Sequence, residues 1–150
     1  MSTQDTVVSH IAVCASDLDH SIRFYTEVFG FALDQRIDIG APFETLTELP
    51  PIKGSAAFLN KDGVRLELVS YQTPEMIGPA ERPPMNQLGL THLAFTVTDL
   101  DAVIGRMAAN GGTVIDQTRV STPAGDLIFC TDPDGVRLEL WQKPEGGAQM

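Results

Sequence analysis

Two long segments of this chain occur twice, and this repeat restricts the possible folds more than any other feature of the sequence. The segment HIAVCASDLDHSI at residues 10–22 aligns with HLAFTVTDLDAVI at residues 92–104. The segment DGVRLEL occurs without a change at residues 62–68 and again at residues 134–140. Because the two motifs follow in the same order in both copies, the chain is interpreted as a tandem duplication of one structural module.

Each copy has the same succession of expected elements. An alternating strand comes first and ends near an aspartate, Asp17 or Asp99, that can cap the helix that follows. Glycines then stop the helix, and three further strands complete the copy. The expected strands are 9–14, 32–39, 55–60 and 64–70 in the first copy, and 91–97, 113–119, 126–131 and 136–141 in the second. The predicted fold class is therefore α+β, with two tandem β-α-β-β-β modules.

The repeat also predicts how the chain is divided. We expect one domain over residues 1–150, with module 1 at about 8–71 and module 2 at about 90–142. The proline-rich segment at about 72–89 is interpreted as a linker, and the tail at 143–150 is expected to be flexible. Module 1 contains an additional segment, residues 40–54, which its prolines predict to be an irregular loop.

Composition limits the partners of the chain. It has 150 residues, of which 43% are hydrophobic, and a net charge of −10, as expected of one globular domain. Without a basic stripe, nucleic acid and anionic membranes are not expected as partners, and no apolar stretch approaches the roughly 20 residues of a membrane span. Cys14 and Cys130 both lie in apolar runs, which predicts buried thiols and a cytoplasmic protein. The expected partner is a small-molecule substrate.

Strand alternation places four repeated side chains on one face of the expected sheet. In the first and last strands of each module, leucine, isoleucine and valine occupy one face. The other face then carries His10, Glu67, His92 and Glu139. A sheet that curls around a cavity would have this pattern. Two imidazoles and two carboxylates suit one divalent ion per site, Zn, Ni, Co, Mn or Fe(II), and a carboxylate beside it can accept a proton.

Other interpretations of the repeated residues remain open. A duplication also copies histidines and glutamates that are purely structural, and His20 is expected at the surface. Arg65 and Arg137 could contact a substrate or pair with acidic neighbours. Tyr71 and Trp141 could form the walls of a pocket together with Phe58, or could pack in the core.

These motifs resemble the vicinal oxygen chelate superfamily, which includes glyoxalase I, methylmalonyl-CoA epimerase, extradiol dioxygenases and the fosfomycin and bleomycin resistance proteins. The resemblance rests on DLDHSIRFYTEVFGF, GLTHLAFTV and DPDGVRLELWQ and extends over residues 8–142. It implies a cupped, barrel-like mixed sheet with helices outside, a bound metal and commonly a homodimer. It further implies ligands on the first and last strand of each module. The matching residues are His10, Glu67, His92 and Glu139.

Two His/Glu pairs resemble the ligand set of glyoxalase I. The resemblance implies a metal-dependent lyase or isomerase, in which Glu139 or Glu67 moves a proton by way of a metal-bound enediolate. Cys14 and Tyr71 stand where that family commonly has an arginine and an asparagine for glutathione, so a different small substrate is expected. The alternatives are an Fe(II) extradiol-type dioxygenase and a non-catalytic, resistance-type binding protein.

Overall fold

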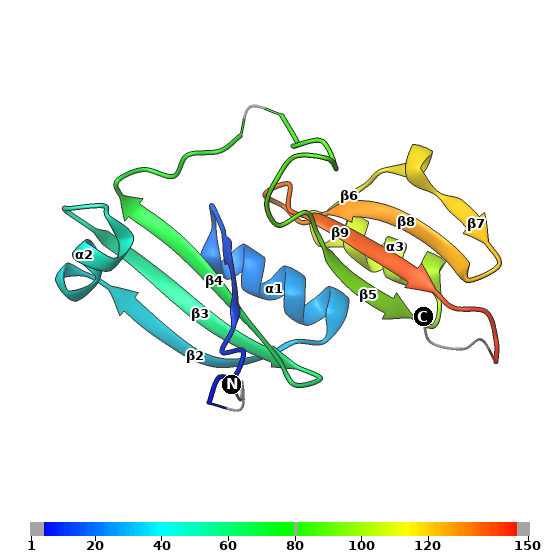
Figure 1. Cartoon of the computed structure of the whole chain (residues 1–150), viewed down its shortest axis with the longest axis horizontal. Helices are drawn as coiled ribbons and strands as arrows, with labels where there is room; N and C mark the ends of the chain where they lie inside the picture. The colour runs from blue at the N-terminus through cyan, green and yellow to red at the C-terminus, as the bar shows by residue number, and fades with distance from the viewer. Residues whose placement is uncertain (1–4, 80, 147–150) are drawn as a thin grey trace. The chain divides into compact units, whose positions relative to one another are not determined.

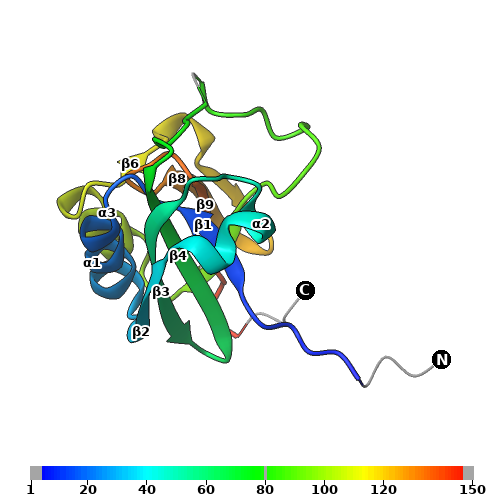
Figure 2. The ribbon, with the colours of Figure 1, turned by 90° about the vertical axis from the view of Figure 1, so that its left-hand side faces the viewer.

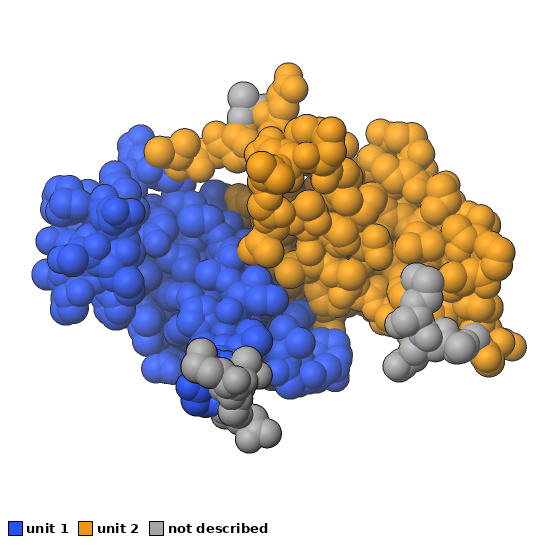
Figure 3. All heavy atoms as spheres, viewed as in Figure 1, with its two compact units in different colours: residues 1–22, 30–76 blue, residues 23–29, 77–150 orange. Residues whose placement is uncertain are grey.

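The computed structural model describes residues 5–79 and 81–146 and has the predicted α+β class. Its contacts divide the chain into two compact units (Figure 3). Unit 1 contains residues 1–22 and 30–76, and unit 2 contains residues 23–29 and 77–150. The sequence predicted a boundary in the linker, and unit 2 additionally takes residues 23–29 from the first helix. Among the described residues, no helix has the length and apolar character needed to cross a membrane.

Unit 1 is built on a four-stranded sheet (Figures 1 and 2). The strand order is β1-β4-β3-β2; β1 pairs in parallel with β4 and the other pairs are antiparallel. The strands are β1 (Ile11–Cys14), β2 (Ala32–Ile39), β3 (Lys53–Lys61) and β4 (Val64–Thr73). Leu66 and Leu68 are almost fully buried, which confirms the predicted apolar face of β4. The turn between the antiparallel strands β3 and β4 has positive φ at Asp62 and Gly63.

The additional segment of module 1 is more ordered than the sequence predicted. It forms a short 3-10 helix, η1 (Ala41–Phe43), and one turn of α-helix, α2 (Glu44–Thr47). Pro42 occupies the start of η1, where its missing N–H does not interrupt a helical hydrogen bond. A carboxylate oxygen of Glu44 accepts from the Ile52 amide at 3.1 Å, and Ile52 packs in a small core with other buried residues. Those residues are Ile39, Ala56 and Val69.

Unit 2 contains the corresponding sheet, in the order β5-β9-β8-β6, with β7 paired to β8. Its strands are β5 (Leu93–Val97), β6 (Thr113–Val114), β7 (Val120–Thr122), β8 (Gly125–Thr131) and β9 (Arg137–Gln142). The single strand predicted at 113–119 is wrong. A 3-10 turn, η2 (Asp116–Thr118), follows β6, and the Thr118 hydroxyl donates to the Ile115 carbonyl at 2.7 Å while accepting from the Phe129 amide at 2.9 Å.

Aspartates begin both long helices, as the sequence predicted. The Asp17 carboxylate accepts from the His20 amide ahead of α1 (Leu18–Phe29), and the Asp99 carboxylate accepts from the Ala102 amide ahead of α3 (Leu100–Ala109), both at 3.0 Å. These bonds satisfy amides that lack an intrahelical partner. In α3 the buried residues are Leu100, Val103 and Met107. Helical spacing from Leu100 also predicts Ile104 and Ala108 on the buried side, but Ala108 is exposed.

A buried hydrogen-bond cluster fixes the turn that leads into β9. The Tyr25 hydroxyl donates to one carboxylate oxygen of Asp132 at 2.9 Å, and the other oxygen accepts from the Asp134 and Val136 amides at 2.9 Å. Burial raises the pKa of Asp132, and burial together with the Asp132 charge raises the pKa of Tyr25 well above 10. Because this turn ends where β9 begins, the cluster determines where the functional residues of β9 lie.

Candidate metal centre

The first His/Glu pair lies entirely in unit 1. His10 immediately precedes β1, and Glu67 lies in β4 opposite Ala12. The His10 Nε2 is 2.9 Å from a carboxylate oxygen of Glu67, and the His10 Nδ1 is 2.8 Å from the Ser9 hydroxyl. Thus one imidazole nitrogen contacts a carboxylate while the other contacts a hydroxyl.

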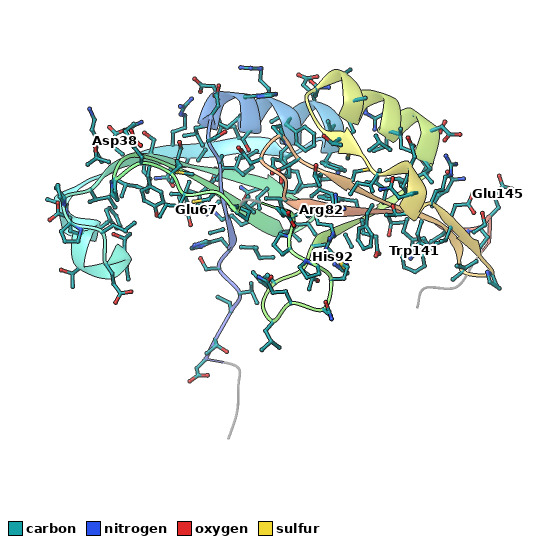
Figure 4. The ribbon with its side chains drawn as sticks, turned by 90° about the horizontal axis from the view of Figure 1, so that it is seen from above. Asp38, Glu67, Arg82, His92, Trp141 and Glu145 are labelled. Atoms are coloured by element: carbon teal, nitrogen blue, oxygen red, sulfur yellow. The ribbon has the colours of Figure 1, made fainter. Side chains whose placement is uncertain are left out.

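The second pair repeats this arrangement in unit 2. His92 immediately precedes β5, and Glu139 lies in β9 opposite Ala94. The His92 Nε2 is 3.6 Å from a carboxylate oxygen of Glu139, and its Nδ1 is 2.8 Å from the Thr91 hydroxyl. Figure 4 shows Glu67 and His92 among the side chains. The residues before the two histidines therefore belong to the repeated arrangement, a role that the sequence reasoning missed although a hydroxyl precedes each histidine.

A phenylalanine and an arginine complete the arrangement in each unit. Phe58 lies opposite Glu67 on β3, with its ring edge-to-face with His10 at 5.5 Å between centroids. The Arg65 guanidinium lies 4.5 Å from the Phe58 centroid. In unit 2, Phe129 is the equivalent, 5.3 Å from the His92 ring, with the Arg137 guanidinium 5.5 Å from its centroid.

Phe129 was not predicted from the sequence. Its position becomes evident from the pairing of β8 with β9, in which it lies opposite Glu139 as Phe58 lies opposite Glu67. The signal was available in the expected strand 126–131, which corresponds to 55–60. Directly opposed residues share a face of the sheet, so each phenylalanine necessarily lies beside its glutamate.

The two repeated arginines differ in their partners. Arg65 forms an ion pair with Asp34 at 3.1 Å, which agrees with the interpretation that it pairs with an acidic neighbour. Arg137 instead donates to the Pro83 carbonyl at 2.9 Å. Burial and the nearby charge of Arg82 lower the pKa of Arg137.

Tyr71 and Trp141 both have partners within their own units. Tyr71 packs against the small core of unit 1, and its amide donates to the Met76 sulfur at 3.2 Å. The Trp141 indole N–H donates to the Ala124 carbonyl at 2.8 Å, and the Lys143 ammonium lies 4.9 Å from its ring. Both side chains remain partly exposed, so their predicted contact with a substrate stays a prediction.

The cysteines do not share one environment. Cys130 is fully buried, and this burial raises the pKa of its thiol to about 11. Cys14 is exposed, which contradicts the prediction of two buried thiols. The short strand β1 lies at an edge of the sheet, so the apolar run IAVCA did not lead to burial. Cysteine burial therefore gives no support to a particular compartment.

The chemistry of each pair fits a divalent metal. An imidazole and a carboxylate converge, and the hydroxyl at Nδ1 leaves Nε2 as the nitrogen that faces the carboxylate. Histidine ligands commonly have such an orienting partner on their second nitrogen. In residues 5–79 and 81–146, no three His, Cys, Asp or Glu side chains gather into one group. Each unit therefore supplies two donors, and a joint site of His10, Glu67, His92 and Glu139 stays a prediction.

A model of the Glyoxalase/Bleomycin resistance protein/Dioxygenase superfamily matches residues 7–140. The chain belongs to this superfamily. It is 31% identical over 149 residues to a 2-epi-5-epi-valiolone epimerase from Actinomyces sp, covering 93% of this chain and 80% of that protein. It is 30% identical over 135 residues to lactoylglutathione lyase GLX1 of Arabidopsis thaliana, covering 89% of this chain and 43% of that longer protein.

The glyoxalase fold is also evident in solved structures. A glyoxalase family protein from Bacillus cereus superimposes with a TM-score of 0.81, covering 95% of this chain and 99% of that one at 21% identity. At this identity the likeness shows the fold. Members of the superfamily typically use a divalent metal, which agrees with the donor chemistry of the two pairs.

Proposed function

We propose that this glyoxalase superfamily member is a metal-dependent lyase or isomerase that moves a proton on a small oxygenated substrate. The observation that carries the proposal is the repeated hydroxyl–His–Glu arrangement, in which Ser9 and Thr91 contact the Nδ1 atoms and the glutamates face the Nε2 atoms. Relatives named as an epimerase and as a lyase support this class of reaction.

His10, Glu67, His92 and Glu139 would hold the metal, once the two pairs come together within one chain or between two chains. A divalent cation held there supplies Lewis-acid polarisation of a carbonyl or hydroxyl oxygen, which acidifies the neighbouring C–H. We assign proton transfer to the two glutamates, with Glu139 as the principal acceptor. Its carboxylate lies 3.6 Å from His92, compared with 2.9 Å between Glu67 and His10, so it is the less constrained of the two.

The hydroxyls of Ser9 and Thr91 are compatible with both tautomers of the histidines, with the proton on Nε2 or on Nδ1. Where Nε2–H donates to the glutamate, Nδ1 is an acceptor and the hydroxyl donates to it. When Nε2 is a metal ligand, the proton must lie on Nδ1, and the same hydroxyl then accepts. A hydroxyl can do either, whereas a carbonyl or an ammonium can do only one. Ser9 and Thr91 therefore act as positioning residues for the two ligands.

The substrate that we propose is a small molecule other than a glutathione adduct. The Cys14 side chain cannot form the bidentate ion pair that an arginine forms with a carboxylate, and Tyr71 packs against the core of unit 1. Phe58 lies against His10 and is a wall of the proposed site, with Trp141 as a further candidate in unit 2. We further propose a homodimer in the cytoplasm.

Metal analysis of the purified protein is the first test. We expect stoichiometric Zn, Ni, Co, Mn or Fe after dialysis, removable by a chelator, and loss of that metal in His92→Gln. His20→Gln, which changes the one histidine outside both pairs, is the matched control and should retain the metal. A wild-type protein that holds no metal and is indifferent to the chelator would instead indicate a non-catalytic binding protein.

Reaction class is tested by incubating the metal-loaded protein with small α-hydroxy ketones and 2-keto aldehydes in deuterated water. We expect NMR to show exchange of the hydrogen next to the carbonyl, and its loss in Glu139→Gln. Oxygen uptake with a catechol and ferrous iron, without any such exchange, would identify the dioxygenase alternative.

A further inference from the structure

One arginine, Arg137, lies beside the His92–Glu139 pair in unit 2. Arg137 precedes Glu139 by two residues in β9, so the two side chains emerge from the same face of the strand, about 7 Å apart along it. The Arg137 guanidinium lies 5.5 Å from the centroid of Phe129, which in turn contacts the His92 ring. One small molecule can therefore reach both Arg137 and the proposed metal ligands of unit 2.

The second arginine is brought to this place by the chain segment before β5. Arg137 donates to the Pro83 carbonyl at 2.9 Å, so the backbone next to Arg82 is held at Arg137. Figure 4 labels Arg82 and His92 among the side chains. The charge of Arg82 acts on Arg137, and Arg82 itself is exposed. In the described part of the chain, no carboxylate lies within ion-pair distance of either guanidinium.

Three other arginines have a carboxylate partner, whereas Arg106 donates to the Val28 carbonyl. Arg36 pairs with Asp19 at 2.7 Å, and Arg119 pairs with Asp101 at 2.9 Å. A net charge of −10 leaves many carboxylates available for such pairs. The charges of Arg82 and Arg137 repel each other, and an anion bound between them would offset this repulsion.

The comparison with module 1 shows why Arg137 lacks a carboxylate. In module 1 the partner of Arg65 is Asp34, which lies two residues after Ala32, the residue opposite Asn60. In module 2 the residue opposite Thr131 is Thr113, and two residues after it is Ile115, which is buried. The second copy therefore has an apolar residue where the first has the acid, and its arginine is left available.

We propose that Arg82 and Arg137 bind an anionic group of the substrate, a carboxylate or a phosphate, next to the metal ligands of unit 2. The guanidinium fork suits either group, because each presents two oxygens in one plane to parallel N–H donors. The inference rests on the proposed function for the remainder of the substrate. It specifies a small acid or phosphate ester whose charged group lies a few atoms from its metal-binding oxygens. Arg65, already paired with Asp34, provides no equivalent subsite in unit 1.

The test uses the full chain without metal, so that it does not depend on the metal centre. Inorganic phosphate and acetate are titrated separately, and binding is followed by NMR at the arginine Nε–H signals. We expect saturable shifts at Arg82 and Arg137. Arg82→Gln and Arg137→Gln should each weaken binding at least about tenfold, the size expected when a charge-assisted hydrogen bond is lost. Arg119→Gln, which removes a paired arginine, is the matched control and should bind like the wild type.

The arms of the experiment have separate meanings. Tighter binding of phosphate assigns a phosphate ester, and tighter binding of acetate assigns a carboxylic acid. Absence of saturable binding by both, or equal binding in Arg82→Gln, Arg137→Gln and wild type, overturns the subsite. Because Arg137→Gln also removes the bond to Pro83, the exposed Arg82→Gln keeps the test independent of folding. Anion binding in a protein that never takes up metal would support the subsite and refute the proposed function.

Discussion

The two His/Glu pairs contain the same residue types, but the distance between imidazole and carboxylate differs between them. In unit 1 the imidazole and the carboxylate are 2.9 Å apart, and the neighbouring Arg65 is neutralised by Asp34. In unit 2 the separation is 3.6 Å, and Arg137 lies near a second positive charge. The duplication thus kept a His/Glu pair in both copies while the surroundings of the pairs diverged. We infer that unit 1 chiefly anchors the metal, whereas unit 2 is the side that contacts and reacts with the substrate.

Exchange of the two glutamates separates these roles most strongly. Glu139→Gln should reduce proton exchange on the substrate by about 10²–10⁴-fold, as expected on loss of a general base, while retaining most of the metal. Glu67→Gln should chiefly lose metal. Parallel metal analysis and NMR exchange assays measure both effects. If Glu139→Gln retained full exchange, the assignment of the base to unit 2 would be wrong.

The histidines test whether the two units contribute to one metal site. His10→Gln and His92→Gln should each lower metal affinity by more than about 100-fold, since even orienting residues around metals contribute 10–100-fold. Competition with a chromogenic chelator gives the affinity, with His20→Gln as the control. A loss confined to one of the two variants would show that the pairs do not share a metal.

The Tyr25–Asp132 cluster at the turn before β9 has no counterpart among the described residues of unit 1. Removing each tyrosine hydroxyl in turn tests how much this cluster stabilises the fold. Tyr25→Phe leaves Asp132 with an unpaired oxygen and should lower the free energy of unfolding by about 1.5–3 kcal/mol. Tyr71→Phe, which removes the other tyrosine hydroxyl of the chain, should have little effect. Denaturant titration at pH 7 distinguishes them, and equal losses would contradict a special role of the cluster.

The same cluster predicts a dependence on alkaline pH. The pKa of Tyr25 is raised in the folded state, so the folded protein retains a proton that the unfolded chain releases above pH 10. The free energy of unfolding should then fall by about 1.4 kcal/mol per pH unit for this group as pH rises above 10. Tyr25→Phe should remove this part of the slope. The stability that Cys130 loses between pH 9 and about 11, and the loss above pH 10 from Tyr71, whose pKa is also raised by burial, should persist in the variant.

The smallest effect expected concerns the hydroxyls beside the histidines. Ser9→Ala and Thr91→Val should each weaken metal binding by about tenfold, because the Nδ1 proton of the ligating imidazole loses its acceptor. Ser9→Thr should bind like the wild type, since the hydroxyl is retained. If both hydroxyl-free variants bound metal as tightly as the wild type, Ser9 and Thr91 would have no role in positioning the histidines.

The residues predicted from the sequence are those fixed by short-range periodicity. Alternation along one strand was sufficient to place Glu67 and Glu139 opposite the buried leucines, and the aspartate caps determined where both helices begin. Alternation within one strand does not indicate Phe129, which would have been found by aligning the expected strand 126–131 with 55–60, where Phe58 has the same place. The interruption of the expected strand 113–119 by η2 depends on hydrogen bonds of the Thr118 hydroxyl. The helix α2 depends on the packing of Ile52, and both contacts arise only in the tertiary structure.

The hydrogen bond between Tyr25 and Asp132 joins residues that are 107 positions apart in the chain. Unit 2 therefore takes its helical residues 23–29 from between the two segments of unit 1, so neither unit can be cut from the chain as one continuous piece. During synthesis, most of the polypeptide must leave the ribosome before Tyr25 can form its hydrogen bond with Asp132.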